Sequence, residues 1–105
     1  MIFLHRFLTR AAILCAYTYV HFVVAVTMEE VETHNSEDDC WSALYGKVYD
    51  LTLYGPEHKG GSAKPRQVWS LCGIDGTSRY DNIHGNKRQW LDKFSSIVLV
   101  GAVTE

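Results

Sequence analysis

The sequence predicts an α+β domain in which short strands and short helices alternate along the chain. Three observations lead to this prediction. Hydrophobic, β-rich runs are brief, the helical stretches between them are also brief, and glycine or proline stands at most of the boundaries. Elements this short cannot supply the crossover helices of a parallel βαβ sheet, so a small sheet with helices beside it is expected.

The first 26 residues differ from the rest and predict a signal peptide or a membrane anchor. Arg6 and Arg10 are their only Asp, Glu, Lys or Arg residues, and residues 11–26 form an uncharged run of 16. This length lies between a signal-peptide core and a full membrane span. A buried element of the domain is the remaining alternative. If the arginines stay cytoplasmic, residues 27–105 are expected to be exported or membrane-anchored on the extracytoplasmic side.

The charge of residues 27–105 restricts the partners of the domain. These residues carry 8 basic against 12 acidic side chains. An acidic domain does not suit nucleic acid, whose phosphates attract basic faces. It predicts instead a partner protein with a basic docking face, attracted over a distance by the opposite charge.

A folded part of about 79 residues has a small core and usually needs a disulfide, metal or cofactor for stability. Cys40 and Cys72 could form a disulfide or remain two separate buried thiols, and the sequence leaves both open. No Cys-x-x-Cys-His motif is present, which excludes covalent attachment of a c-type heme.

The elements of the first half follow from local signals. A capping box of Thr27 and Glu30 predicts a helix over residues 28–33. A polar, acidic loop is expected over residues 35–39. Two strands, residues 40–44 and 47–51, are expected around a turn at Tyr45-Gly46. Residues 52–57 then form a loop, which Gly55-Pro56 interrupts.

The second half is expected to contain three helices and a strand. Ser62 can cap a helix that runs to residue 71, with Pro65 in its first turn. Asp75 or Thr77 can cap a short helix that leads to His84. A last helix over residues 87–94 and a closing strand over residues 97–103 complete the chain.

Two histidines, His58 and His84, are the candidate metal ligands. They lie 26 residues apart, and a glycine follows each within two positions, so the backbone could approach a flat ligand closely. Two neutral imidazoles facing each other across an apolar slot suit the two axial positions of a heme iron, a closed site for one-electron transfer. The slot is expected to be lined by apolar and aromatic residues from both sides, namely Leu51, Tyr54, Val68, Leu71, Tyr80, Ile83 and Leu91.

The two histidines also allow simpler interpretations. Each histidine taken alone is most simply a surface or hydrogen-bonded loop residue. A zinc site would need Cys72 or Asp75 in addition, and no pair of residues has zinc-finger spacing. No serine or cysteine nucleophile has a glycine elbow or a nearby base, so an enzyme is not expected.

Residues 27–103 resemble the cytochrome b5-like heme-binding family. The resemblance rests on Asp39-Cys40-Trp41, Gly46-Lys47-Val48-Tyr49-Asp50-Leu51-Thr52, Glu57-His58-Lys59-Gly60-Gly61, and Leu71-Cys72-Gly73-Ile74-Asp75-Gly76-Thr77 followed by Tyr80 and His84-Gly85. It implies a small sheet with two helix-loop-helix pairs forming a heme crevice, and His58 and His84 as ligands of a non-covalent heme b. It also implies that Leu51, Tyr54, Tyr80, Ile83 and Leu91 line this crevice.

The sequence departs from the family pattern at several places. Lys59 replaces the proline of the first ligand motif, and the stretch between Gly61 and Cys72 is longer than usual and contains Pro65. The resemblance implies an electron carrier that is not itself an enzyme, with a redox protein as partner and membrane contact through an uncleaved N-terminal segment. Some relatives bind steroids or hold heme through tyrosine. A non-redox module for heme, steroid or lipid, and a metal-free interaction domain, therefore remain alternatives.

Overall fold

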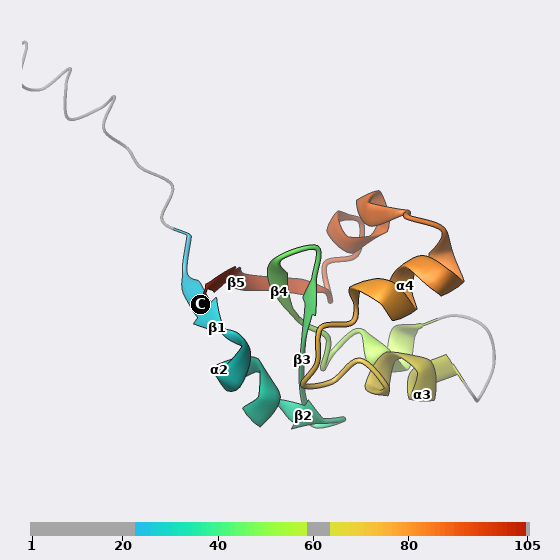
Figure 1. The fold of residues 1–105 in the computed structure, drawn as a ribbon. Coiled ribbons are helices and arrows are strands. Elements are labelled where there is room, and N and C mark those ends of the chain that lie inside the picture. The colour runs from blue at the N-terminus through green and yellow to red at the C-terminus, as the bar shows by residue number, and fades with distance from the viewer. Residues whose placement is uncertain (1–22, 59–63, 105) are drawn as a thin grey trace, which may run out of the picture.

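The computed structural model describes residues 23–58 and 64–104 and shows an α+β fold, as predicted (Figure 1). Its five-stranded sheet has the order β1-β5-β4-β3-β2. Three strands pair antiparallel in the middle: β3 (Asp39–Leu44), β4 (Lys47–Asp50) and β5 (Val98–Thr104). The outer strands are β1 (Ala25–Thr27), parallel to β5, and β2 (Asn35–Ser36), antiparallel to β3.

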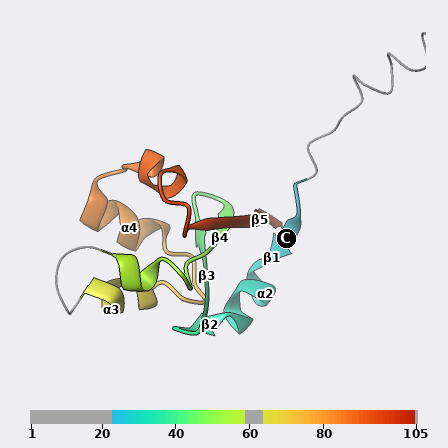
Figure 2. The ribbon, with the colours of Figure 1, turned by 180° about the vertical axis from the view of Figure 1, so that it is seen from behind.

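The helices lie on two sides of this sheet (Figures 1 and 2). Helix α2 (Met28–Thr33) lies on one side, where it follows the edge strand β1 and contacts β1 and β3. Helices α3 (Lys64–Trp69) and α4 (Thr77–His84) lie on the other side, with two 3-10 helices, η1 (Gly55–Glu57) and η2 (Arg88–Asp92). This second group surrounds the candidate site.

Two local predictions are confirmed in the first half of the chain. The Oγ1 atom of Thr27 accepts a hydrogen bond from the backbone N–H of Glu30 at 3.1 Å, which caps α2. The turn between β3 and β4 has a positive φ at both Tyr45 (53°) and Gly46 (77°). Such a turn matches the right-handed twist of the two strands that it joins.

The N-terminal end of the described chain joins the sheet. The sequence assigned Ala25 and Val26 to the leader, whereas the structure places them in β1 beside Ala102 and Val103. The carbonyl of Val24 also accepts a hydrogen bond from the N–H of Ala102 at 2.8 Å. Residues 1–22 lie outside the described residues, so the leader stays a prediction. Within residues 23–58 and 64–104, no helix has the length and apolar character needed to cross a membrane.

Several element boundaries differ from the prediction. Part of the expected polar loop forms β2, because its backbone pairs with the start of β3. Helix α3 ends at Trp69, and the last predicted helix is the shorter 3-10 helix η2. The N-cap of α4 is Gly76, while the Asp75 carboxylate accepts a hydrogen bond from the N–H of Thr77 at 3.1 Å. Ser62, the predicted cap of α3, lies outside the described residues.

The core has two parts, one on each side of the sheet. One contains Val26, Val31 and Val48, all buried. The other contains buried residues of the sheet and of the helices around the site: Cys40, Leu44, Tyr49, Leu51, Val68, Tyr80 and Leu91. A disulfide between Cys40 and Cys72, with the two Cα atoms 4.7 Å apart, crosses this second part and settles the alternative that the sequence left open.

Candidate functional site

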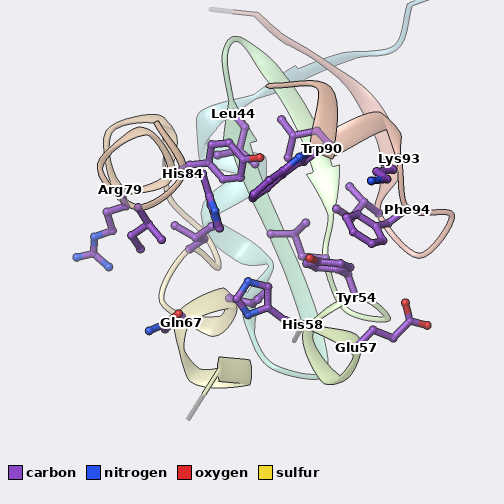
Figure 3. Close-up of a pocket in the computed structure, with 17 residues that line it drawn as sticks. Leu44, Tyr54, Glu57, His58, Gln67, Arg79, His84, Trp90, Lys93 and Phe94 are labelled. Carbon is purple, nitrogen blue, oxygen red and sulfur yellow. The ribbon is translucent and has the colours of Figure 1, made fainter. Parts of the chain in front are cut away.

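One pocket brings together the candidate residues of the sequence analysis. It lies between the sheet and the helices α3, α4, η1 and η2, and its cavity volume is about 320 Å³ (Figure 3). Its lining includes both histidines and all seven predicted apolar or aromatic residues: Leu51, Tyr54, His58, Val68, Leu71, Tyr80, Ile83, His84 and Leu91. Residues 26 positions apart in the sequence thus meet at one site.

The two histidines approach the pocket from different elements. His58 follows η1, and its N–H donates to the carbonyl of Gly55 at 3.2 Å. His84 is the last residue of α4, and Gly85 ends the helix there with a φ of 60°, a left-handed conformation that suits glycine. The centroids of the two imidazole rings are 6.2 Å apart, and the ring planes are inclined by 81°. Both side chains are half-buried.

Aromatic rings pack against both histidines. The ring of His84 lies 4.7 Å from that of Tyr80 and 5.1 Å from that of Trp90, measured between centroids. The ring of His58 lies 5.7 Å from that of Tyr54, which also contacts Phe94 at 5.2 Å. These contacts restrict the rotation of both imidazoles, because dense packing leaves few rotamers free of clashes.

Tyr80 connects α4 with η2. Its hydroxyl donates a hydrogen bond to the carbonyl of Lys87 at 2.8 Å. Burial raises the pKa of Tyr80 to about 12, with smaller contributions from neighbouring tyrosines and Asp81. The phenol therefore stays a neutral donor at physiological pH, which keeps the ring beside His84.

The loop that carries His58 is fixed from two directions. Gly55 lies against the indole of Trp69, so closely that a Cβ at position 55 would stand 1.9 Å from the Cη2 atom. Glu57 accepts a hydrogen bond from the hydroxyl of Ser96 at 2.6 Å. Burial and the charge of Glu57 raise the pKa of Tyr54, so this ring also remains neutral. Helix α3 and the segment before β5 thus hold the first histidine in place.

Some lining residues were not among the predicted site residues. They are the apolar or aromatic Leu44, Trp90, Phe94 and Ile97 and the polar or charged Glu57, Gln67, Arg79 and Lys93. Two of the apolar residues could have been found from the sequence. Trp90 and Phe94 are four residues apart, and with Leu91 they would form one apolar face of a helix. The polar and charged lining residues could not be predicted from the sequence, because exposed polar and charged side chains are ordinary on a small domain.

Two further predictions concern residues close to the pocket. Cys72 is bonded to Cys40, so it has no thiolate to offer to a zinc ion. Lys59, which replaces the family proline beside His58, lies outside the described residues, so its effect on the pocket stays a prediction.

Comparisons with known proteins point to one family. Residues 27–102 match the model of the "Cytochrome b5-like Heme/Steroid binding domain". A soluble cytochrome b558 of Ectothiorhodospira shaposhnikovii is 49% identical over 55 residues, which are 52% of this chain and 57% of that protein. An NADH nitrate reductase of Volvox carteri is 44% identical over 61 residues, which are 58% of this chain and 7% of that protein.

A solved structure extends this similarity to the fold. The cytochrome b558 of Ectothiorhodospira vacuolata, described as a prokaryotic homologue of cytochrome b5, superposes with a TM-score of 0.63 at 32% sequence identity. The match covers 77% of this chain and 99% of that one. By contrast, the chain spans less than two thirds of the length of the curated relatives above.

Proposed function

Because the chain belongs to the cytochrome b5-like heme/steroid-binding domain family, we propose that it is a one-electron carrier whose iron is held by His58 and His84. Domains of this family bind heme b non-covalently, in keeping with the lack of a Cys-x-x-Cys-His motif in this sequence.

The observation that carries the proposal is the distance between the two imidazole rings. A metal–imidazole bond is about 2.0 Å long and a ring nitrogen lies about 1.1 Å from the ring centre, so a metal held between two rings separates their centres by about 6.2 Å. The centroids of His58 and His84 are 6.2 Å apart, and both side chains line the same pocket. The spacing of His58 and His84 therefore fits a metal ion bound between the two imidazoles.

The other residues of the pocket would bind the heme and shield it from water. Leu51, Val68 and Leu91 are buried and give the pocket an apolar wall that excludes water. Tyr80 and Trp90 orient His84, as Tyr54 does His58. Heme with two histidine ligands supplies reversible one-electron reduction and has no open position for oxygen or substrate. On this ground we propose that the chain is not itself an enzyme and acts with a redox partner protein.

A visible spectrum of the full chain loaded with hemin tests the ligand pair. We expect sharp, resolved α and β bands after reduction by dithionite, unchanged by carbon monoxide, because both axial positions are filled. In His58→Ala and His84→Ala, one position opens, and carbon monoxide should shift the reduced spectrum.

His34→Ala is the matched control for these variants. His34 stacks on Trp41 at 3.5 Å, outside the pocket, so its loss should leave the spectrum unchanged. If both pocket variants keep the parent spectrum with and without carbon monoxide, the ligand assignment is wrong.

A second candidate function is a non-redox module that holds heme, a steroid or a lipid. It is favoured by the apolar lining of the pocket, since such cavities accept many small apolar ligands. This function predicts slow reduction, ready loss of heme and a carbon monoxide complex in the unaltered chain. The spectrum above therefore separates the two candidates.

For the location, we propose that the domain lies on the extracytoplasmic side, either exported or anchored by the N-terminal segment. The support is the Cys40–Cys72 disulfide, because disulfides persist mainly in oxidising compartments. Fractionation of cells that express the chain, with intact mass measured under non-reducing conditions, tests this location. A fully reduced chain recovered from the cytosol would contradict it.

A further inference from the structure

Acidic and basic side chains occupy different parts of this domain. Residues 27–50 contain seven acidic side chains and one basic one, whereas residues 51–97 contain seven basic and four acidic ones. Most of the first group lies in or beside α2 and β2, away from α4 and η2 (Figure 1). The net charge of the whole domain therefore does not describe its charge near the histidines.

Four exposed cations lie on α4, on η2 and beside η2: Arg79, Lys87, Arg88 and Lys93. We call this group the basic edge. Within the part of the chain that the structure describes, none of the four forms an ion pair, and the single pair there joins His34 to Asp39. Asp81 and Asp92 lie on the same two elements, and Asp81 accepts a hydrogen bond from the Tyr45 hydroxyl. The segment from Thr77 to Lys93 therefore keeps an excess of two positive charges.

Two cations of the basic edge lie at the outer ends of aromatic contacts that lead to His84. The Lys87 ammonium stands 4.6 Å from the centre of the Trp90 ring, and Trp90 contacts His84 at 5.1 Å. A partner that contacts Lys87 would therefore be one aromatic ring away from the proposed ligand.

The second route begins at Arg88. Its guanidinium lies 4.0 Å from the centre of the Tyr45 ring, and Tyr45 meets Tyr80 edge-on at 6.1 Å. Tyr80 in turn lies 4.7 Å from His84. Both routes end at the same imidazole, so two cations of the basic edge are connected to His84 through aromatic contacts.

We propose that the basic edge is the docking surface for a redox protein with an acidic face. This inference rests on the proposed electron-carrier function and reverses the basic docking face predicted from net charge. Charge is screened over about 8 Å at physiological salt, so the side chains beside the contact outweigh the acids in and beside α2 and β2. The attraction between the basic edge and an acidic face of the partner would steer the partner toward His84.

The carboxylates of heme would offset only part of this edge. Arg79 and Lys93 line the pocket, as does Glu57, so the two propionate groups of a bound heme would offset the charges of these two cations first. Lys87 and Arg88 do not line the pocket and are exposed, so the heme carboxylates would not neutralise their charges directly. The proposal depends on these two residues most.

Electron transfer to small oxidants of opposite charge tests the proposal. The full chain, loaded with hemin and reduced, is mixed with ferricyanide, an anion, or with tris(phenanthroline)cobalt(III), a cation, at increasing ionic strength. If the basic edge governs access, the rate with ferricyanide falls as salt is added, and the rate with the cobalt complex does not. A ferricyanide rate that rises with salt would mean that net charge governs access, and would overturn the proposal.

Single-charge variants locate the effect. Lys87→Gln should lower the ferricyanide rate about twofold at low salt, because one attractive charge beside the contact is lost. Lys47→Gln is the matched control, since Lys47 is exposed on β4 and does not line the pocket. Equal effects of the two variants would contradict docking at the basic edge. No reaction with either oxidant would instead overturn the electron-carrier function, and this inference with it.

A binding measurement addresses the macromolecular partner directly. Hexaglutamate serves as the acidic probe, and we expect it to shift the backbone amide signals of residues 86–93 and to leave those of residues 28–39 unchanged. Shifts confined to residues 28–39, or none, would overturn the proposal. So would binding to phosphatidylserine vesicles that Lys87→Gln abolishes while the ferricyanide rate stays the same, since the edge would then serve a membrane.

Discussion

Cys40 of β3 is joined by a disulfide to Cys72, the residue that follows Leu71 in the wall of the pocket. Cys40 is fully buried in the core. The bond closes a loop with a sequence separation of 32 residues, and this loop includes η1, His58 and α3. It therefore ties the sheet to the segment that carries the first proposed ligand.

We predict that loss of this disulfide destabilises the domain strongly. A loop of this length constrains the unfolded chain by about 3 to 4 kcal/mol on the chain-entropy model. Urea unfolding of the full chain should show a loss of this order in the Cys40→Ala/Cys72→Ala variant and after reduction by a phosphine. Phosphine treatment of the double variant is the control and should leave its stability unchanged. If reductant has no effect on the parent chain, the disulfide contributes nothing.

The contact between Gly55 and Trp69 gives a second prediction. A methyl group at position 55 would overlap the indole ring, whose nearest atoms would be 1.9 to 2.4 Å from it. Gly55→Ala should therefore cost about 1 to 3 kcal/mol and displace η1, which weakens hemin binding through His58. Hemin titration followed at the Soret band measures the effect on affinity.

The double variant Gly55→Ala/Trp69→Leu tests the cause of this loss. Because leucine is smaller than the indole, the two changes together should cost less than the sum of the single ones. Additive losses in affinity and in unfolding free energy would show that the clash is not the reason.

Most of the fold was predictable because its local signals agree with its tertiary contacts. The cap at Thr27, the turn at Tyr45-Gly46 and the strands beside it depend on neighbours in sequence. All nine predicted site residues also line one pocket, since apolar spacing and the family motifs pointed to the same side chains. Their roles toward a cofactor remain predictions.

What could not be predicted depends on contacts between distant segments. Strand β1 exists because β5 offers a free edge and because Gly101 lets the chain pass close to it: a Cβ there would lie 2.2 Å from the Val24 carbonyl oxygen. The basic edge was missed for a related reason. Net charge is a single sum over the domain, and the fold is needed to show that the cations of α4 and η2 lie beside the pocket while most of the acids lie beside α2 and β2.

Tyr80 should make stability depend on alkaline pH. Its pKa is about 12 in the folded protein against 10.0 normally, so the fold favours the neutral phenol. The resulting stabilisation, up to roughly 2 kcal/mol, is fully present below pH 10 and is lost as pH rises through 12. Urea midpoints at pH 8, 10 and 11.5, with brief exposure to base, should therefore fall.

Tyr80→Phe isolates this contribution. The variant should be less stable than the parent at pH 8 by about 1 kcal/mol, because the Lys87 carbonyl loses its hydrogen-bond donor. Its midpoint should fall less steeply between pH 10 and 11.5. Burial also raises the pKa of Tyr49 and Tyr54, so a smaller slope should remain. Parallel curves for parent and variant would exclude Tyr80 as the source.

The pairing of β1 with β5 predicts where the N-terminal segment can be cut, if it is cut. Val26 is buried against Val31 and Val48, and the Val24 carbonyl accepts the hydrogen bond of Ala102. A cut after Ala25 would remove that acceptor and place a charged amino group on buried Val26, which costs about 1 to 3 kcal/mol.

A chain beginning at Val26 should unfold at lower urea than one beginning at Val23, which keeps the Val24 carbonyl and has no charged amino group on Val26. We therefore expect the intact mass of the mature protein to correspond to a first residue no later than Val24. A mature chain that begins at Val26 would show that β1 is dispensable.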